Sequence, residues 1–371
     1  MPLTVNERLL RDAIAHAIDL QRYSNTVVKK IITVLNQSDN DLMIQIRSAL
    51  SRLPVMSFTV QRLDQLLESS RRVTAFAMQQ VGLRLMSELK ELVNYESWYQ
   101  EQGMRKVLPP VIASSSVNQV NVEQVYAAVA SNPLQGRLLS EWHNDLSVRR
   151  STLIRDQLRM GYMQQQTLDQ MAQRIRGTRA NSYTDGVLQI SRREVETLVR
   201  TATANTASVT RDNLYKDNEG LVRRLRWVAT LDTRTSHICR MRDGKEYDAN
   251  TYKPIGHQLS WLGGPGNAHW GCRSVSIPVL KSWRELGMDM EEMSPEERAS
   301  MDGTVAGDLT YGQWLTEQSA DRQDEVLGPA RGALLRKGGM KFEQFSNRKG
   351  DWLTLAQLKR KNSEAFSKAG V

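Results

Sequence analysis

This 371-residue chain has little cysteine, little phenylalanine and no long apolar run. Its two cysteines allow no more than one internal disulfide. The most apolar stretch, near residues 27–35, is interrupted by Lys29 and Lys30, which excludes an ordinary transmembrane helix there. The opening residues Met1-Pro2-Leu3-Thr4 lead directly into an amphipathic segment and not into a secretory signal. We therefore expect a soluble protein with no membrane requirement.

The chain also lacks the signatures of several enzyme classes. It has no phosphate-binding Gly-x-x-x-x-Gly-Lys-Ser/Thr loop, no His-Glu-x-x-His pair and no Gly-x-Ser-x-Gly elbow. No internal repeat is visible. These absences lead us to expect a structural or binding protein with no catalytic residues and no organic cofactor.

The charge balance is basic. Fifty lysines and arginines against forty-one acidic residues give a net charge of +9, which favours contact with polyanions such as double-stranded DNA. A predicted helix carries basic residues along one side, at Arg149, Arg150, Arg155 and Arg159. Such a stripe is a candidate nucleic-acid face, although most charged stripes are simply solvated.

The chemistry-bearing residues concentrate between Trp227 and Pro278. This stretch contains both cysteines and three of the five histidines. Its two ends, residues 225–230 and 274–280, alternate in the manner of β-strands. Asp243-Gly244 and the run Gly263-Gly264-Pro265-Gly266 between them supply turns. The pattern predicts a small, loop-rich β-unit.

This β-unit has few large apolar residues, so we expect something beyond burial to hold its loops. The spacing His269-x-x-Cys272 resembles half of a zinc site, with Cys239 as a third ligand. We take His257 as the fourth ligand, with His237 and Asp232 as alternatives. On a strand, His237 and Cys239 would point the same way. Two buried thiols, or a disulfide between Cys239 and Cys272, are the competing interpretations.

Helical periodicity dominates the rest of the chain. We expect a long helix over residues 5–36, a polar turn at Asn36–Asp41 and a second helix to Leu50. A longer helix capped by Ser57 or Thr59 then continues to Trp98. Ser191-x-x-Glu194 reads as the capping box that opens another helix. Shorter helices are expected over residues 311–323, 330–336 and 353–361, the last followed by a frayed end.

These elements suggest an α+β fold that is mainly α. Long N-terminal helices precede the small β-containing His/Cys unit, and short helices follow it. We divide the chain into four regions: a helical partner-binding region (1–110), a second helical region (111–220), the β-unit (221–282), and a region of short helices with a tail (283–371).

Several motifs in a fixed order resemble one family. They are Arg200-Thr201 with Asn205 on a helix, Trp227-Val228-Ala229-Thr230, Asp232-x-Arg234-Thr235-Ser236-x-x-Cys239, Asp243-Gly244 and His269-x-x-Cys272-Arg273. Thr310–Leu315 and the residues up to Gly338-Gly339 continue the pattern. Together, over roughly residues 170–360, they resemble the phage Mu F-like or SPP1-type head morphogenesis proteins, also called minor head proteins. Many family members end the motif with a further cysteine, where this chain has Ser274.

The resemblance implies a minor capsid protein of a bacteriophage virion. Its partners would be the portal protein and other capsid proteins, in an oligomeric assembly, with non-specific contact to double-stranded DNA. It would lie in the head interior or at the portal vertex, after assembly in the host cytoplasm, and act in procapsid assembly and in DNA packaging or ejection. Arg200, Asp232, Arg234 and Arg273 would form its structural motif, and a buried pair between Arg200 and Asp232 would fix the β-unit to the helices.

The alternative is a metal-dependent nuclease or a toxin-like effector. In that case His237 or His257 would activate water, with Asp232 and Glu246 as the carboxylates. We favour structural zinc held by Cys239, His257, His269 and Cys272, because a Gly-rich unit with two cysteines suits structural ligation.

Overall fold

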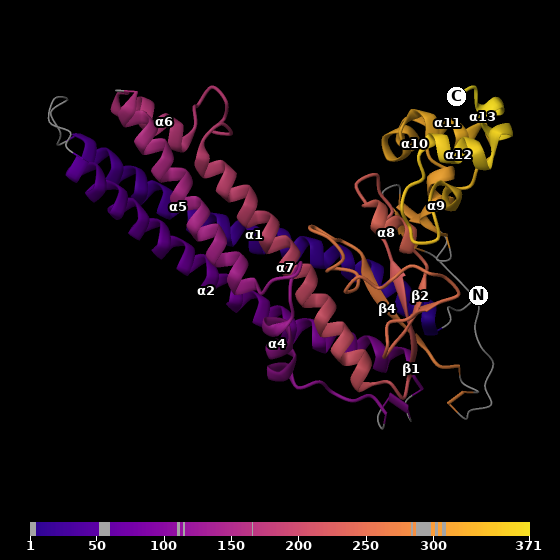
Figure 1. The fold of residues 1–371 in the computed structure, drawn as a ribbon. Helices are drawn as coiled ribbons and strands as arrows, with labels where there is room; N and C mark the ends of the chain where they lie inside the picture. Colours follow the sequence, from indigo (N-terminus) through magenta and orange to yellow (C-terminus); the bar gives the residue numbers. More distant parts are fainter. Residues whose placement is uncertain are drawn as a thin grey trace. The chain divides into compact units, whose positions relative to one another are not determined.

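The computed structural model describes residues 5–51, 60–109, 112–113, 116–164, 166–282, 285–286, 298–300, 303–305 and 309–371. The helix start expected at Ser57 or Thr59 lies outside these residues. The chain forms two compact units: unit 1 comprises residues 1–21, 93–129 and 204–371, and unit 2 comprises residues 22–92 and 130–203. Long N-terminal helices, a small sheet and short C-terminal helices confirm the predicted fold class (Figure 1). The four-region division of the chain stays a prediction.

Helices, four of them long, form most of the described part of the first 217 residues. They are α1 (Val5–Ser51), α2 (Val60–Val107), α4 (Val122–Ser131), α5 (Leu139–Met163), α6 (Leu168–Arg176) and α7 (Val187–Asp217). Within the described chain, no helix contains a stretch long and apolar enough to cross a bilayer.

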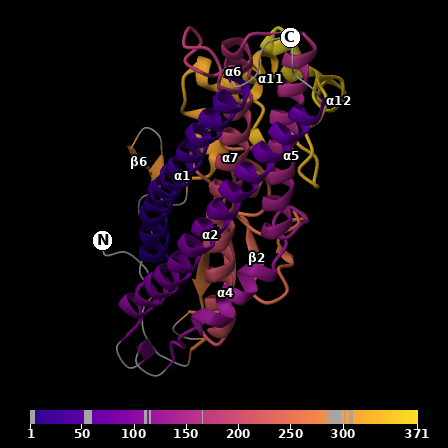
Figure 2. The same cartoon turned by 90° about the vertical axis from the view of Figure 1, so that its left-hand side faces the viewer.

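Unit 2 is built from helices and their connections (Figure 2). Its α1 and α2 segments run antiparallel, because Lys30 Nζ contacts Glu88 Oε1 at 2.8 Å while Ser69 Oγ donates to Gln45 Oε1 at 3.1 Å. Apolar residues of α1, α2, α5 and α7 form its cores, which include Val27, Ile31, Leu35, Val81, Leu85, Ile154, Val195 and Val199. This interior follows from the 3.6-residue periodicity of each helix.

The polar segment Asn36–Asp41 does not form the predicted turn, because α1 passes through it without a break. Asp39 is 3% exposed and forms ion pairs with Arg150 of α5 and Arg192 of α7. These ion pairs keep residues 36–41 helical, although the local propensity of this segment favours a turn. They also remove Arg150, which is 2% exposed, from the basic stripe predicted on α5.

Ser191 does not open a helix. α7 starts at Val187, and the Ser191 hydroxyl lies inside it, donating to Leu188 O at 2.9 Å and accepting from Arg150 Nη1 at 2.5 Å. The predicted capping box is therefore wrong, because its serine is used inside unit 2.

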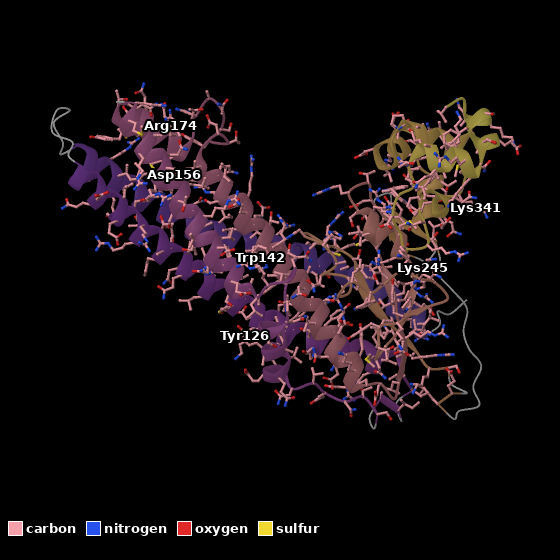
Figure 3. The ribbon with its side chains drawn as sticks, viewed as in Figure 1. Tyr126, Trp142, Asp156, Arg174, Lys245 and Lys341 are labelled. Carbon is pink, nitrogen blue, oxygen red and sulfur yellow. The ribbon has the colours of Figure 1, made fainter. Side chains whose placement is uncertain are left out.

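Short polar contacts fix the end of unit 2 that contains α6. Thr167 caps α6 by accepting from Gln170 N. Arg174, labelled in Figure 3, donates to Gln166 Oε1 at 2.6 Å and to Gln157 Oε1 at 3.3 Å. These bonds join α6 to α5 and to the loop between them.

The sheet of unit 1 is antiparallel, with the order β3-β2-β1-β4. Its strands are β1 (Val222–Val228), β2 (Glu246–Asp248), β3 (Pro254–Ile255) and β4 (Val275–Leu280). β1 pairs with β4 from Val222↔Leu280 to Val228↔Val275, so both predicted strands are adjacent. Two further short strands, β5 (Arg298–Ser300) and β6 (Gly303–Val305), pair with each other.

The sheet has an aromatic core of its own. Trp227 and Tyr247 are fully buried, and Trp261 lies 5.5 Å and 4.8 Å from their rings. Tyr252 stacks on Trp261 at 5.3 Å. The expectation that few large apolar residues hold this unit is therefore wrong. One buried Trp removes roughly 200 Å² from water, worth about 5 kcal/mol at ~25 cal/mol/Å².

The C-terminal part of unit 1 is a cluster of short helices. They are α9 (Tyr311–Thr316), α10 (Ala320–Leu327), α11 (Pro329–Arg336), the 3₁₀ turn η1 (Phe342–Phe345), α12 (Leu355–Lys361) and α13 (Ser363–Ala369). The predicted helix 311–323 is interrupted because Ser319 caps α10. The expected frayed end is instead α13, which is capped by Asn362 and buries Phe366.

A buried polar network lies in the helical part of unit 1. His16 Nε2 contacts Glu96 Oε2 at 2.5 Å, and Arg211 Nη1 donates to Glu96 Oε1 at 3.1 Å. His16 also stacks on Tyr99 at 3.7 Å. His16 is thus packed between a carboxylate and an aromatic ring inside unit 1. Although burial would raise the pKa of Glu96, Arg211 and His16 lower it.

Candidate metal centre

A short helix, α8 (His237–Arg242), positions the first cysteine of the site. Ser236 caps α8, and its Oγ accepts from Cys239 N at 3.4 Å. A strand here would have placed His237 and Cys239 on the same side. The Ser236 cap starts a helix instead, so Cys239 points into the core, 1% exposed.

The other two residues of the site come from the loop between β3 and β4. Cys239 Sγ lies 3.6 Å from Cys272 Sγ and 3.2 Å from His269 Nε2. The three candidate ligand atoms all lie within 4.8 Å of one another. Both cysteines are free thiols in this structure. The fold therefore brings together three of the four predicted metal residues, although Cys239 is 30 positions from His269 and 33 from Cys272 in the chain.

The backbone sets the protonation of His269. Its Nδ1 lies 2.9 Å from the carbonyl oxygen of Trp270, which only accepts hydrogen bonds. Nδ1 must therefore bear a proton, and the neutral ring presents the lone pair of Nε2 toward Cys239 Sγ and Ser236 Oγ. Metal-binding histidines are oriented in the same way, by a carbonyl on the nitrogen that does not bind.

The two thiols have different proton affinities. The hydrogen bond from Cys239 lowers the pKa of Cys272 well below its ordinary value, and Gly266 N–H also donates to Cys272 Sγ at 3.2 Å. The same thiol–thiol bond, together with burial, raises the pKa of Cys239. Burial acts to lower the pKa of His269, but the hydrogen bond with Cys272 and the negative charge on that sulfur override it and raise that pKa. Cys272 is the preferred thiolate.

This donor set fits a metal ion. Two thiolates and a neutral imidazole are ligands that Zn²⁺ prefers, and with Zn–S bonds of ~2.3 Å the sulfur–sulfur edge of a tetrahedron is about 3.8 Å. The observed 3.6 Å between the sulfur atoms is close to that edge. Cys239, His269 and Cys272 are thus a group that could hold a metal. Within the described residues, no further His, Cys, Asp or Glu belongs to this group.

His257, the predicted fourth ligand, is placed elsewhere. Its Nδ1 accepts from Leu259 N at 3.2 Å, so its Nε2 carries the proton and donates to Glu246 O at 2.9 Å. Both ring nitrogens are therefore occupied by backbone groups. His257 lines a cavity of about 420 Å³ that does not include the two cysteines. Lys245, which Figure 3 labels, also lines it.

His237, an alternative fourth ligand, contacts the C-terminal segment. Its Nε2 donates to Gly350 O at 2.6 Å, and its ring stacks on Trp352 at 4.2 Å. Burial lowers the pKa of His237, which keeps the ring neutral in its packed position.

The predicted structural motif forms, with a different pairing. Asp232 pairs with Arg273 through two hydrogen bonds of 2.5 and 2.8 Å. The predicted pairing of Asp232 with Arg200 is wrong, because the Arg200 guanidinium donates to Glu196 Oε1 and to Asn25 Oδ1 instead. Arg234 is exposed in the turn before α8. Burial would raise the pKa of Asp232, but the hydrogen bonds from Arg273 hold it below its ordinary range.

Asp243 holds this region together in a way the sequence analysis missed. Its Oδ1 accepts from Ala229 N and its Oδ2 from Tyr311 N, both at 2.8 Å. Tyr311 in turn donates its hydroxyl to Asp232 O at 2.8 Å. The residue pair Asp243-Gly244 signalled only a turn, because the partners of the carboxylate are 14 and 68 positions away.

Comparison with protein families identifies one match. Residues 152–277 match the family described as "Phage Mu protein F like protein". The predicted resemblance is confirmed over this segment, which is about a third of the chain. Comparisons with curated proteins and with solved structures gave no match.

The Mu F-like segment, residues 152–277, begins within α5 and ends within β4. It contains Cys239, His269 and Cys272, and also the Asp232–Arg273 pair. The candidate metal centre therefore lies inside the part of the chain that matches the family. The resemblance noted downstream, at residues 310–339, lies outside the match and stays a prediction.

Proposed function

We propose that this chain is a minor protein of a bacteriophage head, located at the portal vertex or in the head interior. It acts in procapsid assembly and in DNA packaging or ejection, without catalysis. The observation that supports this most is the match of residues 152–277 to the Mu F-like family. The motif residues in that segment serve packing: Arg273 binds Asp232, and Asp243 joins the residue after β1 to α9.

The proposed protein partners are the portal protein and other capsid proteins. Infected cells should yield procapsids that contain the chain, and an affinity tag on it should recover portal protein from a cleared lysate. Particles assembled without the chain should be fewer or should package or release less DNA. Mature and precursor heads that both lack the chain, with normal yield and DNA content in its absence, would contradict the proposal.

DNA inside the head is the proposed polyanion. Residues 330–371 contain ten lysines and arginines but only three acidic residues. Lys359, Arg360 and Lys361 at the end of α12 are all exposed. Binding to random-sequence duplex DNA should weaken steeply with added salt, because it releases counterions. Replacing these three residues with glutamate should reduce the slope of that dependence.

We also propose that the centre holds a structural zinc ion. Cys239, His269 and Cys272 would bind it and so join α8 to the loop before β4. When bound, the metal supplies a cross-link between segments that are distant in the sequence. His257 does not contribute, because both of its nitrogens are occupied.

A metal-dependent nuclease is the second candidate, and one observation favours it. Three protein ligands with an open fourth position are typical of catalytic zinc, and three are gathered here. Yet the groups that would perform catalysis already have partners: Asp232 binds Arg273, and Glu246 binds Arg224 and Arg226. Cleavage of plasmid DNA that requires Zn²⁺ or Mg²⁺ and disappears in a folded His269→Ala variant would support this candidate over the first.

A further inference from the structure

A groove runs between α1 and α2 in unit 2. It has a volume of about 560 Å³ and is lined by residues 34–45 of α1 and 72–80 of α2. Two large apolar side chains stand at its surface: Ile44 is 65% exposed and Phe76 is 63% exposed. Leu83, seven residues beyond Phe76 and so on the same face of α2, is 57% exposed. Exposed apolar side chains gathered at a groove make this surface a candidate for an interaction.

The charges of the groove are balanced. Asp41 from α1 and Arg72 from α2 both line it and are both exposed. Neither forms an ion pair with the other or with any other described residue. The remaining polar lining, such as Gln37, Gln45 and Gln80, is neutral. The groove thus presents one acid and one base, on opposite helices.

We propose that this groove binds the same groove of a second copy of the chain, related by a two-fold axis. A two-fold interface uses one patch twice, so that patch must be complementary to itself. This one carries both a hollow and the projecting side chains Phe76 and Ile44, and it carries both charge signs. In the dimer, Phe76 of each copy fills the hollow of the other, and Asp41 faces Arg72 of the partner subunit.

The dimer should be weak. Residues 34–45 of α1 extend roughly 17 Å at 1.5 Å per residue. A patch two helices wide and of that length is at the small end of specific interfaces, which bury ~800 Å² per partner in the standard case. We therefore expect a dissociation constant in the micromolar range. This inference uses unit 2 alone and does not depend on the proposed function.

Sedimentation equilibrium of the full chain tests the dimer across concentrations from about 1 to 300 µM. The parent should move from monomer to dimer over this range, and Phe76→Glu should weaken association at least about tenfold. Val148→Glu is the matched control, because Val148 is 59% exposed on α5 but does not line the groove. Helical circular dichroism and its thermal transition verify that each variant is folded.

Charge reversal tests the proposed pairing of Asp41 with Arg72 across the dimer, and it does not require the Phe76→Glu variant to fold. Asp41→Lys and Arg72→Glu should each weaken self-association, since each places like charges opposite one another. When mixed, the two variants should form a heterodimer in preference to either homodimer, because both cross-pairs then have opposite charges. A chain that stays monomeric to about 300 µM, or a dimer that neither Phe76→Glu nor the charge reversals weaken, overturns the proposal. A groove that binds only a different protein is one form of that negative result.

Discussion

Asp232, in the turn after β1, and Arg273, which directly follows Cys272, form an ion pair through two hydrogen bonds. The bonds run from Arg273 Nη1 to Asp232 Oδ2 and from Nη2 to Oδ1. Both side chains are at least three-quarters buried. A planar guanidinium matches a carboxylate in this way, and an ammonium group does not.

Arg273→Lys should therefore lower the free energy of unfolding by about 1–3 kcal/mol, since a charge-assisted bond is lost and Asp232 stays partly buried. Urea denaturation at pH 7 measures the change. Arg234→Lys is the control, because Arg234 is exposed and its replacement should change stability by less than about 0.5 kcal/mol. Equal losses of unfolding free energy in Arg273→Lys and Arg234→Lys would mean that the two-bond geometry of the Asp232–Arg273 pair does not add to stability.

Periodicity and motif order were enough to predict the main features of the fold. The helical stretches, strands β1 and β4, and the approach of Cys239 to His269 and Cys272 all followed from local patterns. The helix of residues 36–41 did not, because Asp39 is held by Arg150, 111 positions away. Local sequence reports the propensity of a segment but not the identity of its distant partner.

The site shows the same limit. His257 lies in the same cysteine- and histidine-rich stretch as the ligands, yet its ring is engaged by Leu259 N and Glu246 O. The position of a histidine in the sequence does not show whether backbone groups already bond to both of its ring nitrogens. One missed signal was available: Ser236 before a helix-compatible segment is an N-cap pattern, and it would have placed Cys239 on a helix.

Metal content is the direct test of the centre. Protein purified under reducing conditions should contain about one zinc per chain by elemental analysis, and Cys239→Ser, Cys272→Ser and His269→Ala should each lose it. His257→Ala should keep the metal, because that ring is outside the group. The variants should melt at lower temperature yet stay folded, since the aromatic core around Trp227 remains.

A metal-free parent whose melting temperature does not change in Cys239→Ser would contradict the zinc site. Counting thiols in denaturant without reductant then separates the other two states. Two reactive thiols indicate buried cysteines, and none indicates a disulfide, which the 3.6 Å between the sulfur atoms would permit after a small movement.

Neighbouring arginines on α5 allow a matched comparison. Arg150 is buried, bonded to Asp39 and Ser191, so Arg150→Met leaves a buried carboxylate with Arg192 alone. We expect a loss of about 3 kcal/mol in the free energy of unfolding. The Arg149 side chain is 63% exposed and pairs with Glu194 at the surface, so Arg149→Met should cost at most about 1 kcal/mol. Urea denaturation of both variants checks the difference, and similar losses would contradict it.

Asp212 on α7 should make stability depend on pH. Burial raises its pKa to about 7, and its Oδ1 has no hydrogen-bond partner. Because the folded state holds this proton more tightly than the unfolded state, the chain should lose stability as pH rises from about 4 to about 7. Asp212→Asn removes the charge and should stabilise the chain by about 1–2 kcal/mol at pH 8, a figure reduced for the partial exposure of the carboxyl group.

Urea denaturation from pH 4 to pH 8 separates this effect from a packing change. The gain in Asp212→Asn should disappear near pH 4, where both side chains are neutral. Asp217→Asn is the control, since Asp217 lies on the same helix but is exposed. A gain that is the same at every pH would show that Asp212 does not titrate on folding.

Two glycines near the candidate metal centre should respond differently to alanine. Gly266 and Gly271 both have positive φ, +92° and +67°, so each alanine carries a backbone strain of roughly 1 kcal/mol or more. A Cβ on Gly266 would also come within 2.6 Å of Ala204 O on α7, whereas a Cβ on Gly271 meets nothing within 4 Å. Gly266→Ala must therefore displace its loop, including the N–H that donates to Cys272 Sγ.

We expect Gly271→Ala to lower the free energy of unfolding by about 1 kcal/mol in urea denaturation and to keep its zinc. Gly266→Ala should cost at least twice as much and bind zinc more weakly in competition with a chelator. Equal stability and equal zinc retention in the two variants would show that close packing of this loop against α7 does not support the site.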